Sequence, residues 1–256
     1  MLGHATGKAR TELLAHPEHG VLAAQEGAFQ ELIARREAAE PIAYLVGERE
    51  FYGRMFRTDR RALIPRPETE LLVDLGKTAV ARWRAAGVEP NVVDVGTGCG
   101  AIAISLAAEA SVRVVATDVS GAALALARDN TTLQALRTTV SLVQTDLLAG
   151  LRRPLHVVLA NLPYVPGGRD LPRDVKDYEP SLAIFGGARG TELIERCLHE
   201  ARPLLAPGAE ACVELDEENQ SAHIAALARE LYPDAEVSTC QDAGGYDRVV
   251  RVRLEP

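Results

Sequence analysis

A run of alternating glycines lies near the middle of the chain. A short apolar segment, NVVDV, is followed by Gly96, Thr97, Gly98, Cys99 and Gly100 and then by an alanine-rich stretch that predicts a helix. Glycine lets the backbone approach a ligand closely, and a helix N-terminus favours an anionic group. The spacing GxGxG differs from the dinucleotide-binding GxGxxG, and no Gly-Lys-Ser/Thr follows as in a P-loop. The run therefore predicts a ligand-binding loop of another kind.

Acidic residues mark the ends of the next two predicted strands. Asp118 ends the segment VRVVATD, and Asp146 and Leu147 follow VSLVQT. A carboxylate at Asp118 can accept both hydroxyls of a ribose, and Leu147 can border an adenine. A glycine turn or a strand-end aspartate alone is also ordinary βα-loop chemistry. The three features in this order predict a site for a nucleoside-containing cofactor.

A polar tetrapeptide, Asn161-Leu162-Pro163-Tyr164, follows a further apolar strand. An amide or exocyclic amine is a poor nucleophile, because its nitrogen lone pair is delocalised. The Asn161 side-chain oxygen and the Leu162 carbonyl can accept its two hydrogens, which turns the lone pair toward an electrophile. Tyr164 can stack on the planar group and on a nearby sulfonium. The rate then comes from alignment and electrostatics, and the structural alternative is a simple Asn-x-Pro turn.

The remaining pattern indicates the elements that position these residues. Residues 10–40 predict helices interrupted at Pro17 and Gly20, and Gly53 predicts a turn between two short strands. A helix is predicted from about Pro67. From about residue 90, apolar strands alternate with helices, and the last two strands predict a hairpin. This is an α/β fold with a mostly parallel sheet, covered on both faces and ending in an antiparallel hairpin.

Composition excludes several classes of protein. The chain has 256 residues, a net charge of −8, 47% hydrophobic and 25% charged residues, which argues against binding to nucleic acid by bulk charge. No apolar run reaches the length of a membrane span, and the N-terminus has no signal-peptide pattern. The four cysteines form no CxxC pair and the six histidines show no metal-binding spacing, so we expect a cytoplasmic protein without a metal site.

The glycine loop resembles the first motif of the Rossmann-like S-adenosylmethionine-dependent methyltransferases. This resemblance implies that Gly96 to Gly100 pass close to the methionine part of S-adenosylmethionine, near Asn161. It also implies that Asp118 holds the ribose and that Asp146 or Leu147 borders the adenine. The tetrapeptide resembles the Asn/Asp-Pro-Pro-Tyr motif of amino-methyltransferases, with Leu162 in place of the first proline. The form Asn-Leu-Pro-Tyr is also similar to the corresponding motif of the rRNA adenine dimethyltransferases.

Longer segments resemble the bacterial release-factor glutamine N5-methyltransferases: EPIAYLVGEREFYG, LIPRPETE, YEPSLA followed by FGG, and QDAGGYDRVV. This resemblance implies methyl transfer to a glutamine of a peptide chain release factor. It implies a docking portion over residues 1–65 and a methyltransferase domain over residues 66–256. Arg66, which lies between two prolines, would line the substrate pocket. Glu179 and Pro180 would border it, although a simple turn is the alternative.

Other substrates and one other class of protein stay open at this point. The same chemistry suits a glutamine of a ribosomal protein or an adenine of rRNA, and the net charge weighs against rRNA. A nucleotide-sensing module without catalysis is the alternative from another class. We expect a monomer that binds neither membrane nor nucleic acid directly.

Overall fold

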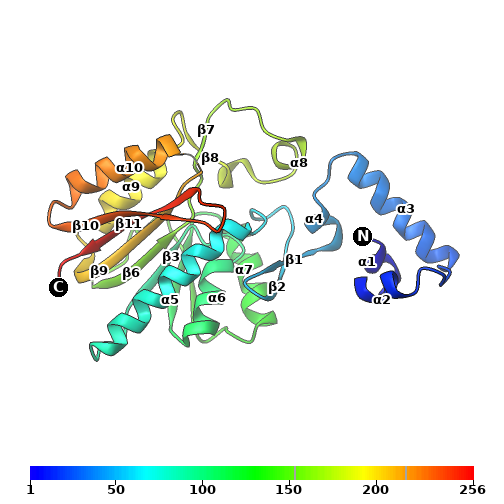
Figure 1. Ribbon diagram of the computed structural model, residues 1–256, viewed down its shortest axis with the longest axis horizontal. Coiled ribbons are helices and arrows are strands. Elements are labelled where there is room, and N and C mark those ends of the chain that lie inside the picture. The colour runs from blue at the N-terminus through cyan, green and yellow to red at the C-terminus, as the bar shows by residue number, and fades with distance from the viewer. Residues whose placement is uncertain (153, 217) are drawn as a thin grey trace.

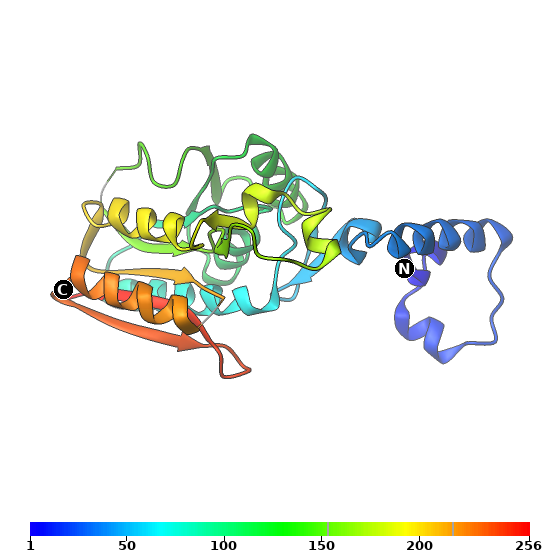
Figure 2. The ribbon, with the colours of Figure 1, turned by 90° about the horizontal axis from the view of Figure 1, so that it is seen from above.

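The N-terminal part of the chain consists of helices that lie apart from the central sheet (Figures 1 and 2). The computed structural model describes residues 1–152, 154–216 and 218–256, leaving aside the side chains of residues 218 and 219. The helices are α1 (Leu2–Thr6), α2 (Arg10–Ala15), α3 (Ala23–Glu37) and α4 (Ile42–Val46). The predicted interruption at Pro17 and Gly20 is confirmed, and α1 was not predicted.

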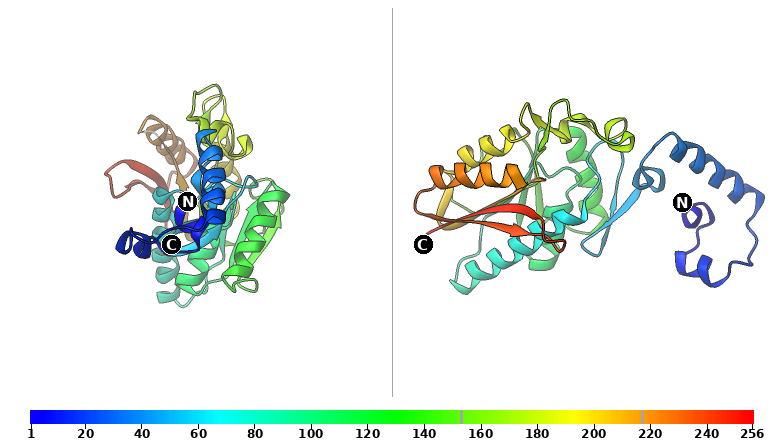
Figure 3. Two further views of the ribbon diagram at one scale, coloured as in Figure 1. Left: turned by 90° about the vertical axis from the view of Figure 1, so that its right-hand side faces the viewer. Right: turned by 45° about the horizontal axis from the view of Figure 1, so that its top comes forward.

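A hairpin connects these helices to the rest of the chain (Figure 3). Its strands are β1 (Glu48–Phe51) and β2 (Arg54–Arg57). Tyr52 and Gly53, which join them, both have positive φ angles of 51° and 69°, as a tight two-residue turn requires. Phe51 and Phe56 are buried against each other with their ring centroids 6.0 Å apart. The predicted turn at Gly53 is confirmed.

In the described part of the chain, seven strands form the central sheet in the order β10-β11-β9-β6-β3-β4-β5. They are β3 (Val92–Val95), β4 (Val114–Asp118), β5 (Val140–Gln144), β6 (Leu155–Ala160), β9 (Leu205–Glu214), β10 (Ala235–Gln241) and β11 (Asp247–Leu254). β3, β4, β5, β6 and β9 pair in parallel, and β10 and β11 are antiparallel. The predicted mostly parallel sheet with a C-terminal hairpin is confirmed.

Helices cover both faces of this sheet because its central strands are apolar on both sides. One face packs on α5 (Glu70–Ala85), which follows the turn η1 (Pro67–Thr69), and on α6 (Ala101–Ala110) and α7 (Gly121–Leu133). The other face packs on α9 (Glu192–Ala201) and α10 (Glu218–Leu231). Val92 belongs to the core on the side of α5, α6 and α7, whereas Val93 and Val95 belong to the core on the side of α9 and α10. Among the described residues, no helix is both long and apolar enough to cross a membrane.

The connection between β6 and α9 contains small elements that the sequence did not predict. They are β7 (Val165–Pro166), α8 (Arg173–Lys176), η2 (Ser181–Ala183) and β8 (Phe185–Gly187). β7 and β8 pair in parallel, which closes the intervening segment into a loop. Gly186 permits this approach, since a Cβ there would collide with the Pro163 carbonyl oxygen. The loop therefore returns to the end of β6.

The order of the strands reverses at β3, because β4 and β5 lie on one side of it and β6 and β9 on the other. A crevice forms outside the carboxyl ends of parallel strands at such a point, and ligands bind there in open α/β sheets. The glycine loop follows β3 and the tetrapeptide follows β6. The topology thus brings the two motifs together.

Candidate active site

A cavity of about 340 Å³ lies at the carboxyl ends of the parallel strands. Most of the predicted site residues line it: Gly96, Thr97, Gly98, Cys99, Asp118, Asp146, Leu147, Asn161, Leu162, Pro163, Arg66 and Pro180. Gly100, Tyr164 and Glu179 are not among the described residues that line the cavity. Gly100 is instead the N-cap of α6, with a φ angle of 88°.

The glycine loop depends on backbone conformations that other residues rarely adopt. Gly96 and Gly98 have φ angles of 71° and 56°. A Cβ at Gly96 would also lie 2.8 Å from a methyl carbon of Leu162, so the two motifs pack directly on each other. At Gly98, the nearest atom to such a Cβ is the Cβ of Ala62, 3.9 Å away. The backbone at Gly98 is therefore open to a ligand.

Asp94, the acidic residue that precedes the loop, is completely buried. Its Oδ2 accepts hydrogen bonds from the Thr97 hydroxyl at 2.6 Å and from the Ala103 backbone N–H at 3.1 Å. Burial raises the pKa of Asp94 to about 7, and these two hydrogen bonds lower it in part. Asp94 thus joins the loop to the first turn of α6 and holds the loop in shape.

Asp118 faces the cavity from the end of β4. Its Oδ2 accepts from the Gly98 backbone N–H at 2.9 Å, and its Oδ1 accepts from the Ser120 backbone N–H at 2.8 Å. Burial raises the pKa of Asp118, while these backbone hydrogen bonds lower it. Each carboxylate oxygen retains acceptor capacity, so the pair of oxygens can receive two vicinal hydroxyls.

The residues after β5 form the next part of the wall. Leu147 is almost fully buried and has a φ angle of 48°, which is unusual for a residue other than glycine. Asp146 accepts a hydrogen bond at 2.8 Å from Arg196 of α9, and both side chains line the cavity. Arg196 had no predicted role. An apolar surface edged by a charged pair suits a flat aromatic group with polar edges.

Asn161 follows β6 and is held from outside its own strand. Its amide Nδ2 donates a hydrogen bond to the Thr69 hydroxyl at 2.9 Å. Among the described residues, none donates to Asn161 Oδ1 or to the Leu162 carbonyl oxygen. Both acceptors are therefore free for a ligand with an –NH2 group. Thr69 belongs to the segment PRPETE, which the resemblance includes, but nothing in the sequence marked its contact with Asn161.

Tyr164, which was predicted to stack on the substrate, is half-buried and is not among the described residues that line the cavity. Its side chain packs against the core formed with α9 and α10, and burial raises its pKa. Its carbonyl oxygen accepts a hydrogen bond from Gln220 Nε2 at 2.9 Å. The chain enters β7 directly after Tyr164, and β7 pairs with β8.

Arg66 and Glu179 form an ion pair behind the wall of the cavity. The Glu179 side chain is only 1% exposed, and its Oε2 accepts from the Ile64 backbone N–H at 3.0 Å. Glu179 therefore ties the segment around Arg66 to the loop that carries Pro180. Arg66 and Pro180 reach the cavity as predicted, whereas Glu179 supports them from inside the protein.

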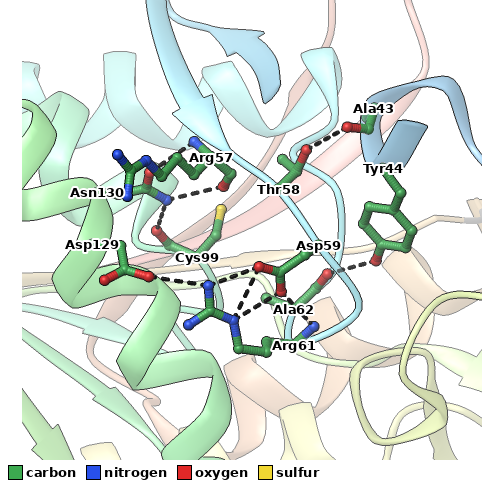
Figure 4. A network of polar contacts seen from close by, with 10 residues as sticks. All are labelled: Ala43, Tyr44, Arg57, Thr58, Asp59, Arg61, Ala62, Cys99, Asp129 and Asn130. Carbon is green, nitrogen blue, oxygen red and sulfur yellow. Dashed lines mark hydrogen bonds and ion pairs between the residues drawn. The ribbon is translucent and has the colours of Figure 1, made fainter. Parts of the chain in front are cut away.

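Hydrogen bonds connect the end of β2 and the segment after it to α4 and, through α7, to the glycine loop (Figure 4). The Asn130 amide of α7 accepts from the Arg57 N–H at 2.8 Å and donates to the Cys99 carbonyl oxygen at 2.9 Å. On the other side, the Tyr44 hydroxyl donates to the Ala62 carbonyl oxygen at 2.8 Å. Burial raises the pKa of Cys99 to about 12, so its thiol remains neutral and acts as a small apolar group.

Two protein-family models match separate parts of the chain. The model of the PrmC N-terminal domain matches residues 1–47. The model of the methyltransferase small domain matches residues 70–175. The second match includes the glycine loop and the tetrapeptide.

Among solved structures, similarity extends to several methyltransferases. The Mtq2–Trm112 complex of E. cuniculi, described as responsible for methylation of the eRF1 translation termination factor, aligns with a TM-score of 0.51 at 24% identity. This alignment covers 76% of this chain and 99% of that chain. The catalytic domain of human Mettl16 aligns with a TM-score of 0.62 at 17% identity, covering 84% and 79%. At such identities these structures show the fold.

Curated relatives extend the similarity over nearly the whole chain. A release factor glutamine methyltransferase of Deinococcus radiodurans is 37% identical over 99% of this chain and 88% of its own length. Those of Rhodopirellula baltica and Bacillus anthracis are 34% and 33% identical, over 99% and 100% of this chain and 87% and 91% of their own lengths. Because these identities extend over nearly the full length of both proteins, the chain belongs to the family of release factor glutamine methyltransferases.

Proposed function

We propose that this chain transfers a methyl group from S-adenosylmethionine to the side-chain amide nitrogen, N5, of a glutamine in a peptide chain release factor. The observation that carries the proposal is the position of Asn161. It lies beside the glycine loop with its side-chain oxygen free and its amide nitrogen engaged by Thr69. A primary amide is the group that this pair of free acceptors, Asn161 Oδ1 and the Leu162 carbonyl, would bind.

The residues around the glycine loop fit S-adenosylmethionine. Asp118 would hold the ribose hydroxyls, Leu147 would border the adenine, and Gly96 to Cys99 would pass along the methionine part. Gly98 supports this fit, because its backbone is open to the cavity and its N–H is bonded to Asp118. When bound, the cofactor supplies an electrophilic methyl group on a sulfonium.

The chain's own residues would make the glutamine nitrogen reactive by orienting it. Asn161 Oδ1 and the Leu162 carbonyl accept the two N–H groups of the amide, which places the nitrogen lone pair toward the methyl group. A new N–C bond forms as the S–C bond breaks, and one N–H proton then leaves to solvent. No side chain has to act as a strong base, and the acceleration comes from alignment.

Arg66, Pro163 and Pro180 would bind the substrate around the glutamine. Arg66 offers a guanidinium that is one-third exposed at the cavity, and its geometry is fixed by Glu179. Tyr164 then acts by packing the end of the tetrapeptide in place. Residues 1–65 would serve as the docking portion and residues 66–256 as the methyltransferase domain. The proposal describes a cytoplasmic monomer that needs no direct contact with nucleic acid.

Incubation with labelled S-adenosylmethionine tests the substrate. Purified release factor, ribosomal protein and rRNA are offered separately, and the release factor is then examined by mass spectrometry. The expected result is one added methyl on one glutamine of the release factor. Labelling of rRNA or of ribosomal protein in place of the release factor would overturn the proposed substrate.

A further inference from the structure

Three polar side chains from distant parts of the sequence form a chain behind the tetrapeptide. Asn161 Nδ2 donates to the Thr69 hydroxyl at 2.9 Å, and this hydroxyl donates to Glu214 Oε1 at 3.1 Å. Thr69 and Glu214 are buried, with 4% and 1% of their surface exposed. This series of hydrogen bonds runs from the cavity into the interior of the protein.

The fold explains why these groups meet. β6 and β9 are parallel neighbours, with Ala160 paired to Val213. Asn161, directly after β6, and Glu214, the last residue of β9, therefore occupy equivalent positions. Side chains alternate between the faces of a strand, and Leu159 and Cys212 belong to the core on the α5 side. Asn161 and Glu214 therefore point to the same side, where Thr69 precedes α5.

The direction of the hydrogen bonds decides which end of the Asn161 amide meets the cavity. A threonine hydroxyl has one hydrogen, and Glu214 Oε1 accepts it, either as a carboxylate oxygen or as the C=O oxygen of a neutral carboxyl group that carries its proton on Oε2. Because Thr69 gives its hydrogen to Glu214, its oxygen must accept from Asn161, and only the –NH2 end of the amide can donate. The amide oxygen is then directed to the substrate.

Glu214 is a costly residue at this place. Its Oε2 is buried and has no hydrogen-bond partner among the described residues. Burial raises the pKa of Glu214 to about 8, with Glu68 and Asp216 raising it further and Thr69 and Arg248 lowering it. A buried carboxyl with one hydrogen bond does not stabilise the fold, so a role in the site accounts for it better.

We propose that Thr69 and Glu214 are positioning residues, and that Glu214 orients the Thr69 hydroxyl so that Asn161 presents its oxygen to the substrate amide. This inference rests on the proposed function of Asn161. The reversed amide would place an –NH2 group against the –NH2 of the glutamine. In that state no N–H of the substrate is accepted by Asn161, and the lone pair is not aligned.

Substitution of Thr69 tests the inference directly. Thr69→Val keeps the shape and removes the hydroxyl, and it should lower kcat for methyl transfer roughly 10- to 100-fold. The dissociation constant of S-adenosylmethionine, measured by calorimetry, should change less than about 3-fold, because Asp118 and the glycine loop are untouched. Thr69→Ser retains the hydroxyl and should restore most of kcat.

A matched control separates this role from the loss of any buried hydroxyl. Thr131 of α7 is also buried, and its hydroxyl donates only to the Arg128 carbonyl of its own helix at 2.9 Å. Thr131→Val should leave kcat within about 2-fold of the wild type. An unchanged kcat in Thr69→Val would overturn the inference. A loss of kcat in Thr69→Ser and Thr131→Val as large as that in Thr69→Val would also overturn it.

Glu214→Gln provides a second and independent test. The glutamine amide can accept from Thr69 or donate to it, so Asn161 should adopt both orientations and kcat should fall by less than in Thr69→Val. Adding Glu214→Gln to Thr69→Val should cause no further loss, because the two residues act through one hydrogen bond. A double variant whose loss of kcat equals the product of the two single losses would contradict the inference. Failure of the wild type to methylate any glutamine would instead refute the proposed function.

Discussion

The two walls of the cavity are held by different kinds of interaction. The cofactor wall consists of the ends of β3, β4 and β5, which are neighbours in the sheet and consecutive in the chain. Asp118 is fixed there by two backbone N–H groups. The substrate wall joins the end of β6 to Arg66, Thr69 and Pro180, which belong to other segments.

Side chains from distant parts of the sequence fix the substrate wall. Thr69 bonds both Asn161 and Glu214, and Glu179 bonds both Ile64 and Arg66. In the proposed function, backbone geometry would bind the shared cofactor, and a tertiary network of side chains would orient the particular substrate. Substitutions in the two walls should therefore affect different measured quantities.

The largest effect is expected at Asn161. Asn161→Ala removes one of two acceptors for the substrate amide, so methyl transfer should fall at least about 100-fold. The affinity for S-adenosylmethionine should stay within several-fold of the wild type, as calorimetry can show. Full methyl-transfer activity in this variant would contradict the assignment of Asn161 to the substrate wall.

The opposite result is expected at Asp118. Asp118→Asn keeps the shape and removes the charge that would accept the ribose hydroxyls. Hydrogen bonds to charged groups contribute about 1.5–3 kcal/mol, so the affinity for S-adenosylmethionine should fall roughly 10- to 100-fold. The kcat at saturating cofactor should change little. A lower kcat with normal cofactor affinity would contradict the assignment of Asp118 to the cofactor wall.

A smaller effect, on stability and on substrate affinity, is expected at Arg66. Arg66→Ala leaves the buried Glu179 carboxylate without its ion-pair partner, which costs about 1–3 kcal/mol. Thermal unfolding should show a lower Tm, and the KM for the release factor should rise. Arg66→Ala combined with Glu179→Gln should recover part of the stability but not the KM. Recovery of both would place Arg66 outside the substrate wall.

The smallest effect concerns pH. The pKa of Glu214 is raised from 4.5 to about 8 in the folded protein, so the native state retains a proton that the unfolded chain loses. Its contribution to stability is therefore complete below about pH 4.5 and is lost as the pH rises to about 8. Unfolding of the wild type and Glu214→Gln at about pH 5 and pH 8 measures this. The Tm of the variant relative to that of the wild type should be higher at about pH 8 than at about pH 5. An equal difference in Tm at the two pH values would contradict this prediction.

Much of the cofactor wall was predictable because its parts are local. Glycine spacing and strand ends depend on residues close in sequence, and the structure has them where they were expected. The alternation of apolar strands and helices likewise predicted the sheet and both of its covered faces. The predicted fold and family are confirmed.

The substrate wall was predicted only in part. The motif placed Asn161, Leu162 and Pro163 at the end of β6, and Arg66 and Pro180 also reach the cavity. Tyr164 is half-buried against the core formed with α9 and α10 and is not among the described residues that line the cavity. Glu179 lies behind the wall because two donors of the segment 64–66 bind its carboxylate.

The sheet, the glycine loop and the tetrapeptide could be predicted from the sequence, since each follows from neighbouring residues. The contacts of Thr69 with Asn161 and with Glu214 depend on the tertiary structure. These residues lie on different elements, and only the packing of α5 over β6 and β9 brings them within hydrogen-bond distance. An amide has two ends of nearly equal shape, and the direction in which it binds depends on partners that no local pattern specifies.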